Sequence, residues 1–191
     1  MTDFEFVFVL YSLILGLSNV ELLGGFGRTL QAKYVKRNSS NSVAKIGWLT
    51  PLLGLFVLLD LMSFWMAAWV VRGEIHVSSL TLMAIMMFAS TYYLAACMVF
   101  PPEIDQSTDL DDHYFRVRRL IMSLLLVLLF AQLGFYSFVP ALVPKLLAPA
   151  PLLLTTILVA LMVAAMLAKS KKSNLVILVV LCLRYVVIYL I

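Results

Sequence analysis

At 191 residues the chain has the length of one or two soluble domains, but 63% of its residues are hydrophobic and only 13% are charged. Ordinary globular proteins have roughly 45–50% and about 25%, so a soluble domain of this composition would lack the polar surface to cover its apolar residues. The composition therefore predicts an integral membrane protein in contact with the lipid bilayer. The formal net charge is +4, but the basic residues are not interleaved with aromatic residues and form no recognisable nucleic-acid-binding motif. We therefore expect no nucleic-acid partner.

Six stretches are long and apolar enough to cross a bilayer as helices. A spanning helix needs roughly 20 mostly apolar residues, because the hydrocarbon core is about 30 Å thick. The predicted spans are residues 5–26, 47–70, 77–99, 120–139, 151–168 and 174–191. Prolines mark their ends, since Pro101 and Pro102 follow the third span and Pro149 and Pro151 open the fifth. The pattern predicts one all-α domain over residues 1–191, a six-helix transmembrane bundle with short loops.

Lysine and arginine are distributed unevenly between the loops. The loops after spans one, three and five hold eleven of the 14 basic residues, whereas the opposite side holds only Arg72 and Lys145. Basic residues accumulate in cytoplasmic loops, so this bias predicts that both termini lie on the outer side of an inner or plasma membrane.

Span one carries small and polar residues in an ordered pattern. Ser12, Gly16 and Asn19 lie on one face, and Ser12 and Gly16 are spaced as a small-xxx-small pair that lets another helix approach closely. Glu21 lies off this face, near the cytoplasmic end, within reach of water or a basic neighbour. Glycines at positions 24, 25 and 27 predict that the helix bends or unwinds there. Two hypotheses stay open: helix packing, and a broken-helix site where Glu21 binds a cation or proton.

Two further ionisable residues lie close to mid-bilayer, Asp60 in span two and Arg184 in span six. A charge inside hydrocarbon costs about 2.5–3.5 kcal/mol on insertion scales, so such side chains tend to face the bundle interior and to carry function. Spans two and six run in the same direction, so these two charges could meet. One hypothesis is a salt bridge that sets helix register. The other makes Asp60 a mid-membrane site, with Arg184 as its counter-ion and barrier.

The loop between spans three and four has the polarity of a soluble protein. Ser107 or Thr108 is expected to cap a helix that runs straight into span four, with aspartates in its first turn and an ion pair between Asp112 and Arg116. Arg118 is expected at the level of the lipid headgroups. A metal site on the aspartates and histidine, or a docking site for a partner, are the alternatives. The sequence lacks the glycine and terminal glutamate of an EF-hand loop, so no metal or cofactor is expected.

Polar residues from several spans lie at similar depth, including a run at residues 90–93 in span three. They predict a hydrophilic pathway for an ion or proton. The pathway would be lined by residues of four spans: Asn19, Glu21, Asp60, Gln132 and Arg184. The sequence has no selectivity-filter motif and no arginine ladder of a voltage sensor.

Catalytic signatures are missing from this sequence. Its two histidines, His76 and His113, fall on opposite sides of the predicted membrane, and no HExxH, GxSxG or CxxC motif occurs. We therefore expect no enzymatic activity, and the leading hypothesis is a channel, a transporter or a proton- or cation-sensitive membrane protein. Such a small bundle would form a water-accessible pathway more easily as a homo-oligomer. The alternative is a non-catalytic subunit that anchors or assembles with another membrane protein.

Overall fold

The computed structural model describes residues 3–34, 47–73, 78–104 and 109–190, and within these ranges the chain is helical with no strand. Six helices are long and apolar enough to span a membrane. A seventh, α5, is a single turn between two of them. The helices are α1 (Asp3–Tyr34), α2 (Leu49–Val70), α3 (Ser79–Val99), α4 (Leu110–Ser137), α5 (Val143–Leu146), α6 (Pro149–Leu167) and α7 (Lys171–Leu190). The predicted six-helix membrane bundle is confirmed. The side on which the termini lie stays a prediction.

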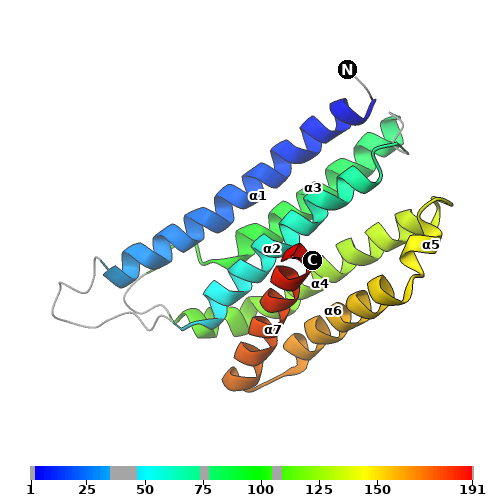
Figure 1. Ribbon diagram of the computed structural model, residues 1–191. Coiled ribbons are helices and arrows are strands. Elements are labelled where there is room, and N and C mark those ends of the chain that lie inside the picture. Colours follow the sequence, from blue (N-terminus) through cyan, green and yellow to red (C-terminus); the bar gives the residue numbers. More distant parts are fainter. Residues whose placement is uncertain (1–2, 35–46, 74–77, 105–108, 191) are drawn as a thin grey trace.

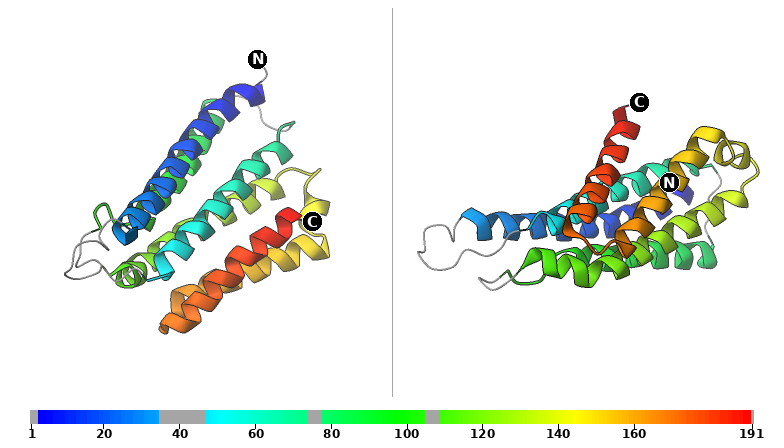
Figure 2. Two further views of the ribbon diagram at one scale, coloured as in Figure 1. Left: turned by 60° about the vertical axis from the view of Figure 1, so that its left-hand side comes forward. Right: turned by 90° about the horizontal axis from the view of Figure 1, so that it is seen from below.

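The long helices form two layers of three (Figures 1 and 2). One layer contains α1, α2 and α7, and the other contains α3, α4 and α6, so that α2 lies in the middle of its layer. Across the layers, α1 packs on α3, α2 on α4, and α7 on α6. The interior is filled by large apolar and aromatic side chains, whereas many leucines and valines are exposed on the outer faces, as expected for a protein surrounded by lipid.

The helix ends follow the proline signals. Helix α3 ends at Val99, just before Pro101 and Pro102, and α6 begins with Pro149 in its first turn. Proline has no backbone N–H to donate and is therefore tolerated at a helix start but not in a helix interior.

Helix α1 differs from the prediction, because it continues without a break through its glycines to Tyr34. The expected bend is wrong. A helix satisfies its own backbone groups in a bilayer, and Gly25 serves packing instead of bending. A Cβ atom on Gly25 would lie 2.1 Å from the ring of Phe100, so the missing side chain makes room for that ring. At Gly16, where the sequence predicted close helix packing, a Cβ atom would meet nothing within 4 Å in this chain.

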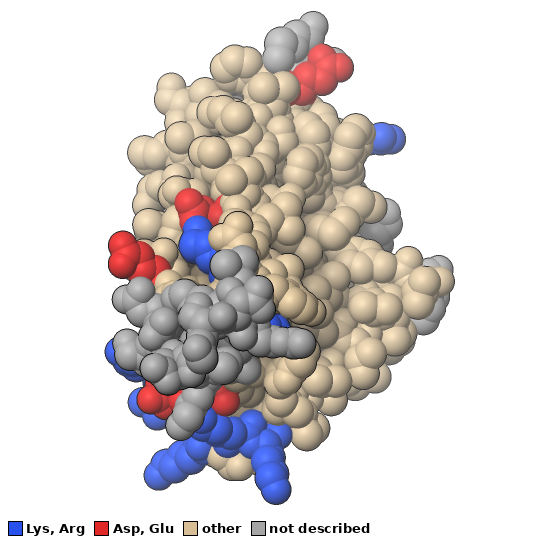
Figure 3. Space-filling model, turned by 90° about the vertical axis from the view of Figure 1, so that its left-hand side faces the viewer, with Lys and Arg blue, Asp and Glu red and all other residues tan. Residues whose placement is uncertain are grey.

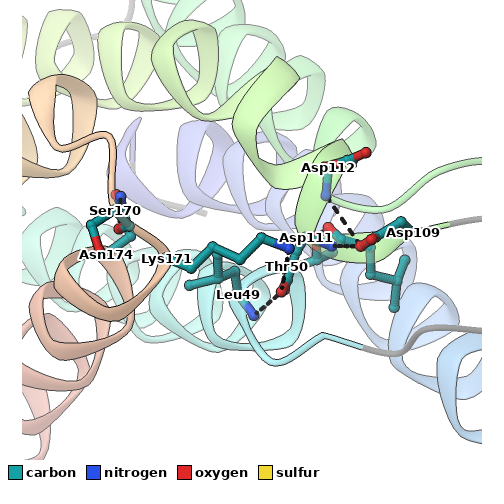
Figure 4. A network of polar contacts seen from close by, with 9 residues as sticks. Leu49, Thr50, Asp109, Asp111, Asp112, Ser170, Lys171 and Asn174 are labelled. Atoms are coloured by element: carbon teal, nitrogen blue, oxygen red, sulfur yellow. Dashed lines mark hydrogen bonds and ion pairs between the residues drawn. The ribbon is translucent and has the colours of Figure 1, made fainter.

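Most lysine and arginine side chains gather at one end of the molecule, here called the basic end (Figure 3). It consists of the last turns of α1, α3 and α6 and the first turns of α2, α4 and α7. The polar contacts there join several helices (Figure 4). The carboxylate of Asp111 accepts from the backbone N–H of Leu49 at 3.3 Å and pairs with Lys171 Nζ at 3.3 Å. The hydroxyl of Thr50 donates to the carbonyl of Leu110.

The loop before α4 was predicted correctly in outline and wrongly in detail. One helix does run from Leu110 straight into the fourth span. The predicted caps, Ser107 and Thr108, lie outside the described residues. Asp109 is the N-cap, and its side chain accepts from the N–H groups of the second and third residues after it. The expected pair between Asp112 and Arg116 does not form, since the only salt bridge among the described residues is that of Asp111 with Lys171.

Candidate functional site

Asp60 lies in the middle of α2 with only 5% of its surface exposed. The hydroxyl of Tyr185, on α7, donates to carboxylate atom Oδ1. The hydroxyl of Tyr92, on α3, lies 3.5 Å from Oδ2 and 2.6 Å from the carbonyl oxygen of Val57, to which it donates. A tyrosine hydroxyl carries a single proton, so Tyr92 serves chiefly the backbone and Tyr185 is the main donor to the carboxylate. Two tyrosines from neighbouring helices therefore enclose this acid.

Arg184 does not form the predicted salt bridge. Both residues are described, and no nitrogen of Arg184 lies within 4.0 Å of the Asp60 carboxylate. The Nε atom of Arg184 instead donates to the carbonyl of Leu154 on α6 at 3.2 Å, and its guanidinium lies 4.9 Å from the ring centre of Tyr185. Successive helix residues point about 100° apart, so when Tyr185 points at α2 its neighbour turns toward α6.

The sequence pattern placed Tyr92, in the run at residues 90–93, at a depth similar to that of Asp60 but gave Tyr185 no role. A signal for it was present, since Tyr185 directly follows the one arginine inside span six. A buried tyrosine in an apolar helix usually finds a hydrogen-bond partner for its hydroxyl, and the nearest polar group at that depth on another helix is a good candidate. What the pattern could not supply is which of the two adjacent side chains faces Asp60.

The other predicted site residues lie apart. Gln132 donates through Nε2 to the hydroxyl of Tyr136 at 2.8 Å. Asn19 and Glu21 are half-buried on α1 and make no hydrogen bond or ion pair with any described residue. No two of the five predicted site residues share a hydrogen bond or salt bridge in the described structure. The predicted layer is therefore divided into separate groups instead of forming one connected chain of polar side chains.

A cavity of about 580 Å³ lies between the first turns of α1 and α3 and the last turns of α2 and α4. We call it the α1–α4 cavity. Its walls are mainly aromatic and apolar, and none of its lining residues is Lys, Arg, Asp or Glu. The polar residues in its lining are Tyr11, Ser78, Thr81, Gln132 and Tyr136. It lies at the end of the bundle opposite to the basic end, and the charge bias predicts that this end is on the outer side of the membrane.

Two aromatic rings, those of Phe64 and Tyr92, lie between this cavity and Asp60. Phe64 lines the cavity and packs edge-on against Phe88 at 5.2 Å and against Tyr92 at 5.5 Å between ring centres. The hydroxyl of Tyr11, also in the lining, donates to the carbonyl of Phe64 at 3.2 Å. Because Tyr92 contacts the carboxylate of Asp60, the path from cavity to acid runs through two rings.

A second buried polar cluster lies at the basic end. Arg118 was expected at the headgroups, yet it is only 4% exposed. Its Nη1 atom donates to the carbonyls of Ala165 and Ala168 and, at 2.8 Å, to the amide oxygen of Asn174. The hydroxyl of Tyr114 donates to the same amide oxygen at 2.8 Å. Arg118 therefore caps the last carbonyls of α6 and connects the α6–α7 hairpin to α4, which is a structural role. A positive charge is favourable there because the C-terminal end of a helix dipole is negative.

No known protein family matches this chain. No curated protein and no solved structure matches it either. Its function is therefore inferred from the geometry of the Asp60 group and of the α1–α4 cavity.

Proposed function

We propose that this polytopic membrane protein is a small proton-coupled transporter of a neutral, largely apolar molecule. The observation that carries the proposal is the α1–α4 cavity, whose aromatic wall packs on the tyrosine that lies next to a buried acid. The cavity would hold the transported molecule, and Asp60 would take up and release the proton.

The lining of the cavity supports a neutral molecule over an ion. Its volume of about 580 Å³ falls in the range of small-molecule sites, which are mostly apolar with a few polar groups that set orientation. An ion would need charged side chains or a ring of carbonyls to replace its hydration shell. The lining has no charged side chain, but the amide oxygen of Gln132 receives no hydrogen bond from a described residue. That oxygen could accept from a hydroxyl or N–H group of the molecule.

The hydrogen bonds of Asp60 suggest how the proton and the molecule would be coupled. The ionised carboxylate accepts from Tyr185, whereas a carboxyl protonated on Oδ2 could in addition donate to the hydroxyl oxygen of Tyr92, which would draw that hydroxyl closer. The ring of Tyr92 packs on Phe64 in the cavity wall. A proton on Asp60 and a molecule in the cavity would then bias the same pair of rings. Coupling between two sites needs such a shared element.

Reconstitution into liposomes with a trapped pH-sensitive dye tests the proposal. Indole, a neutral aromatic molecule with one hydrogen-bond donor, serves as the probe under an imposed proton gradient. We expect indole-dependent proton movement with the native chain and none with Asp60→Asn. The matched control is Asp112→Asn, which removes an exposed acid at the basic end and should leave the movement unchanged.

A pair of size variants tests the role of the cavity independently of the acid. Ala68→Phe fills part of the cavity and should reduce indole-dependent movement at least tenfold. Ala160→Phe adds the same ring to the exposed face of α6 and should have no effect. Absence of proton movement in the native chain, with and without indole, would overturn the proposal. A second membrane protein that co-purified at fixed ratio would in that case favour the assembly role.

A further inference from the structure

Helix α1 carries two polar side chains that form no hydrogen bond or ion pair within the described bundle. Asn19 and Glu21 make no hydrogen bond or ion pair with any described residue. The helix continues for 13 residues beyond Glu21 to Tyr34, about 20 Å at 1.5 Å per residue. Glu21 lies close enough to Tyr93 on α3 to interact electrostatically with it, and Tyr93 directly follows the tyrosine that contacts Asp60. Both polar residues therefore lie well within a helix that is long and apolar enough to span a bilayer, where unpaired polar groups are unfavourable.

The two residues flank the outward face of α1. Val20, between them, is 65% exposed and marks the centre of that face. At about 100° per residue, Asn19 points to one side of Val20 and Glu21 to the other. The face itself allows close approach, because a Cβ atom on Gly16 would meet nothing within 4 Å and one on Gly24 would meet only the side chain of Arg28. Figure 1 places α1 at the edge of the bundle.

We propose that a second copy of this chain covers this face and forms a parallel two-fold dimer through α1. Copies in one membrane have the same orientation, so their α1 helices run parallel. A two-fold axis between parallel helices sets each flank of one helix against the opposite flank of the other. Asn19 therefore faces Glu21 of the partner subunit, and the same pair recurs on the other side of the axis. The two residues differ in height by about 3 Å, which their side chains span easily.

The chemistry of the two side chains matches in this arrangement. The amide of Asn19 has two N–H donors, and a carboxylate accepts without donating. Hydrogen bonds to a charged acceptor are stronger than neutral ones, and each dimer contains the pair twice. The unpaired polar groups carry the proposal, and the glycines only permit the helices to come close. The proposal is independent of the proposed transport, because these residues line neither the α1–α4 cavity nor the Asp60 group.

Disulfide cross-linking in native-like membranes tests the contact. In a background with Cys97→Ala and Cys182→Ala, Val20→Cys should form a disulfide-linked dimer on mild oxidation. Leu183→Cys, on the exposed face of α7, is the matched control and should remain monomeric. A Val20→Cys variant that stays monomeric, or that links to a protein of another size, would overturn the self-association.

Dimer affinity in lipid, measured by counting subunits in single liposomes, tests the pair itself. Asn19→Leu removes two hydrogen bonds per dimer and should raise the dissociation constant roughly tenfold. Glu21→Gln keeps an acceptor opposite Asn19 and should retain most of the affinity. Equal affinity of the native chain and Asn19→Leu would refute the pairing. A chain that is monomeric at every protein-to-lipid ratio would refute the dimer.

Discussion

Replacing Gly25 by alanine adds one methyl group where the ring of Phe100 packs against α1. The new Cβ atom would lie 2.1 Å from Cδ2 and 2.8 Å from Cβ of Phe100. Rotation of the ring relieves the first contact and not the second, because Cβ is fixed to the backbone at the end of α3. The ring has little space to move, since its far end lies where a Cβ atom on Gly54 would be only 2.7 Å away.

Two opposing effects set the change in the free energy of unfolding. Overpacking of a filled interior costs about 1–3 kcal/mol, and contacts this short belong at the upper end. Alanine in place of glycine stabilises a helix by about 1 kcal/mol. We therefore expect Gly25→Ala to lower the free energy of unfolding by about 2 kcal/mol. Gly27→Ala, two residues along the same helix and with no atom within 4 Å, should raise it by up to about 1 kcal/mol.

Unfolding by dodecyl sulfate in mixed micelles, followed by circular dichroism, measures both values. Phe100→Ala is added to complete a double-mutant cycle. If the ring is the cause, Gly25→Ala should cost nothing in that background, which gives a coupling energy of about 2–3 kcal/mol. Equal stability of Gly25→Ala and Gly27→Ala, or a cost that persists without the ring, would show that Phe100 does not occupy this space.

Three further predictions concern the polar groups. Arg118→Met should lower the free energy of unfolding in the same assay by about 2–3 kcal/mol, because it leaves buried carbonyls without a donor; full stability in Arg118→Lys would contradict a role that depends on the planar guanidinium. Phe64→Ala opens the wall before Asp60 and should speed its labelling by an apolar carbodiimide at least tenfold, measured by mass spectrometry with Asp60→Asn as the unlabelled control; an unchanged rate would mean that the ring is no barrier. Asp109→Ala should cost about 1 kcal/mol of stability and Asp109→Ser much less, since serine also caps helices; equal losses would exclude capping as the cause.

The sequence predicted those parts of the fold that depend on one helix at a time. Span number follows from the length of apolar runs, and the ends of α3 and α6 follow from proline chemistry. Contacts between helices were predicted less well. Arg118 lies among basic loop residues in the sequence and gives no sign that three helices close around it.

The candidate site shows the same limit of sequence-based prediction at the level of single side chains. Depth along a span identified Asp60 as a mid-membrane acid, and depth can be counted from the sequence. The rotation of α7 decides whether Arg184 or Tyr185 faces that acid, and an almost uniformly apolar helix has no pattern that sets its rotation. The α1–α4 cavity is likewise formed by four helix ends, and its residues are unremarkable individually.

The polar contacts of α7 have a consequence for how this helix finds its place. Asn174 binds Arg118 near its start, and Tyr185 binds Asp60 eleven residues later. Eleven residues correspond to about three turns, so both side chains lie on the same face. Apolar side chains can slide along one another in lipid at little cost, because lipid tails are as apolar as leucine. A shift of α7 by one residue would break both contacts at once, so two polar side chains fix its rotation and height, and the exposed leucines and valines between them are free to vary.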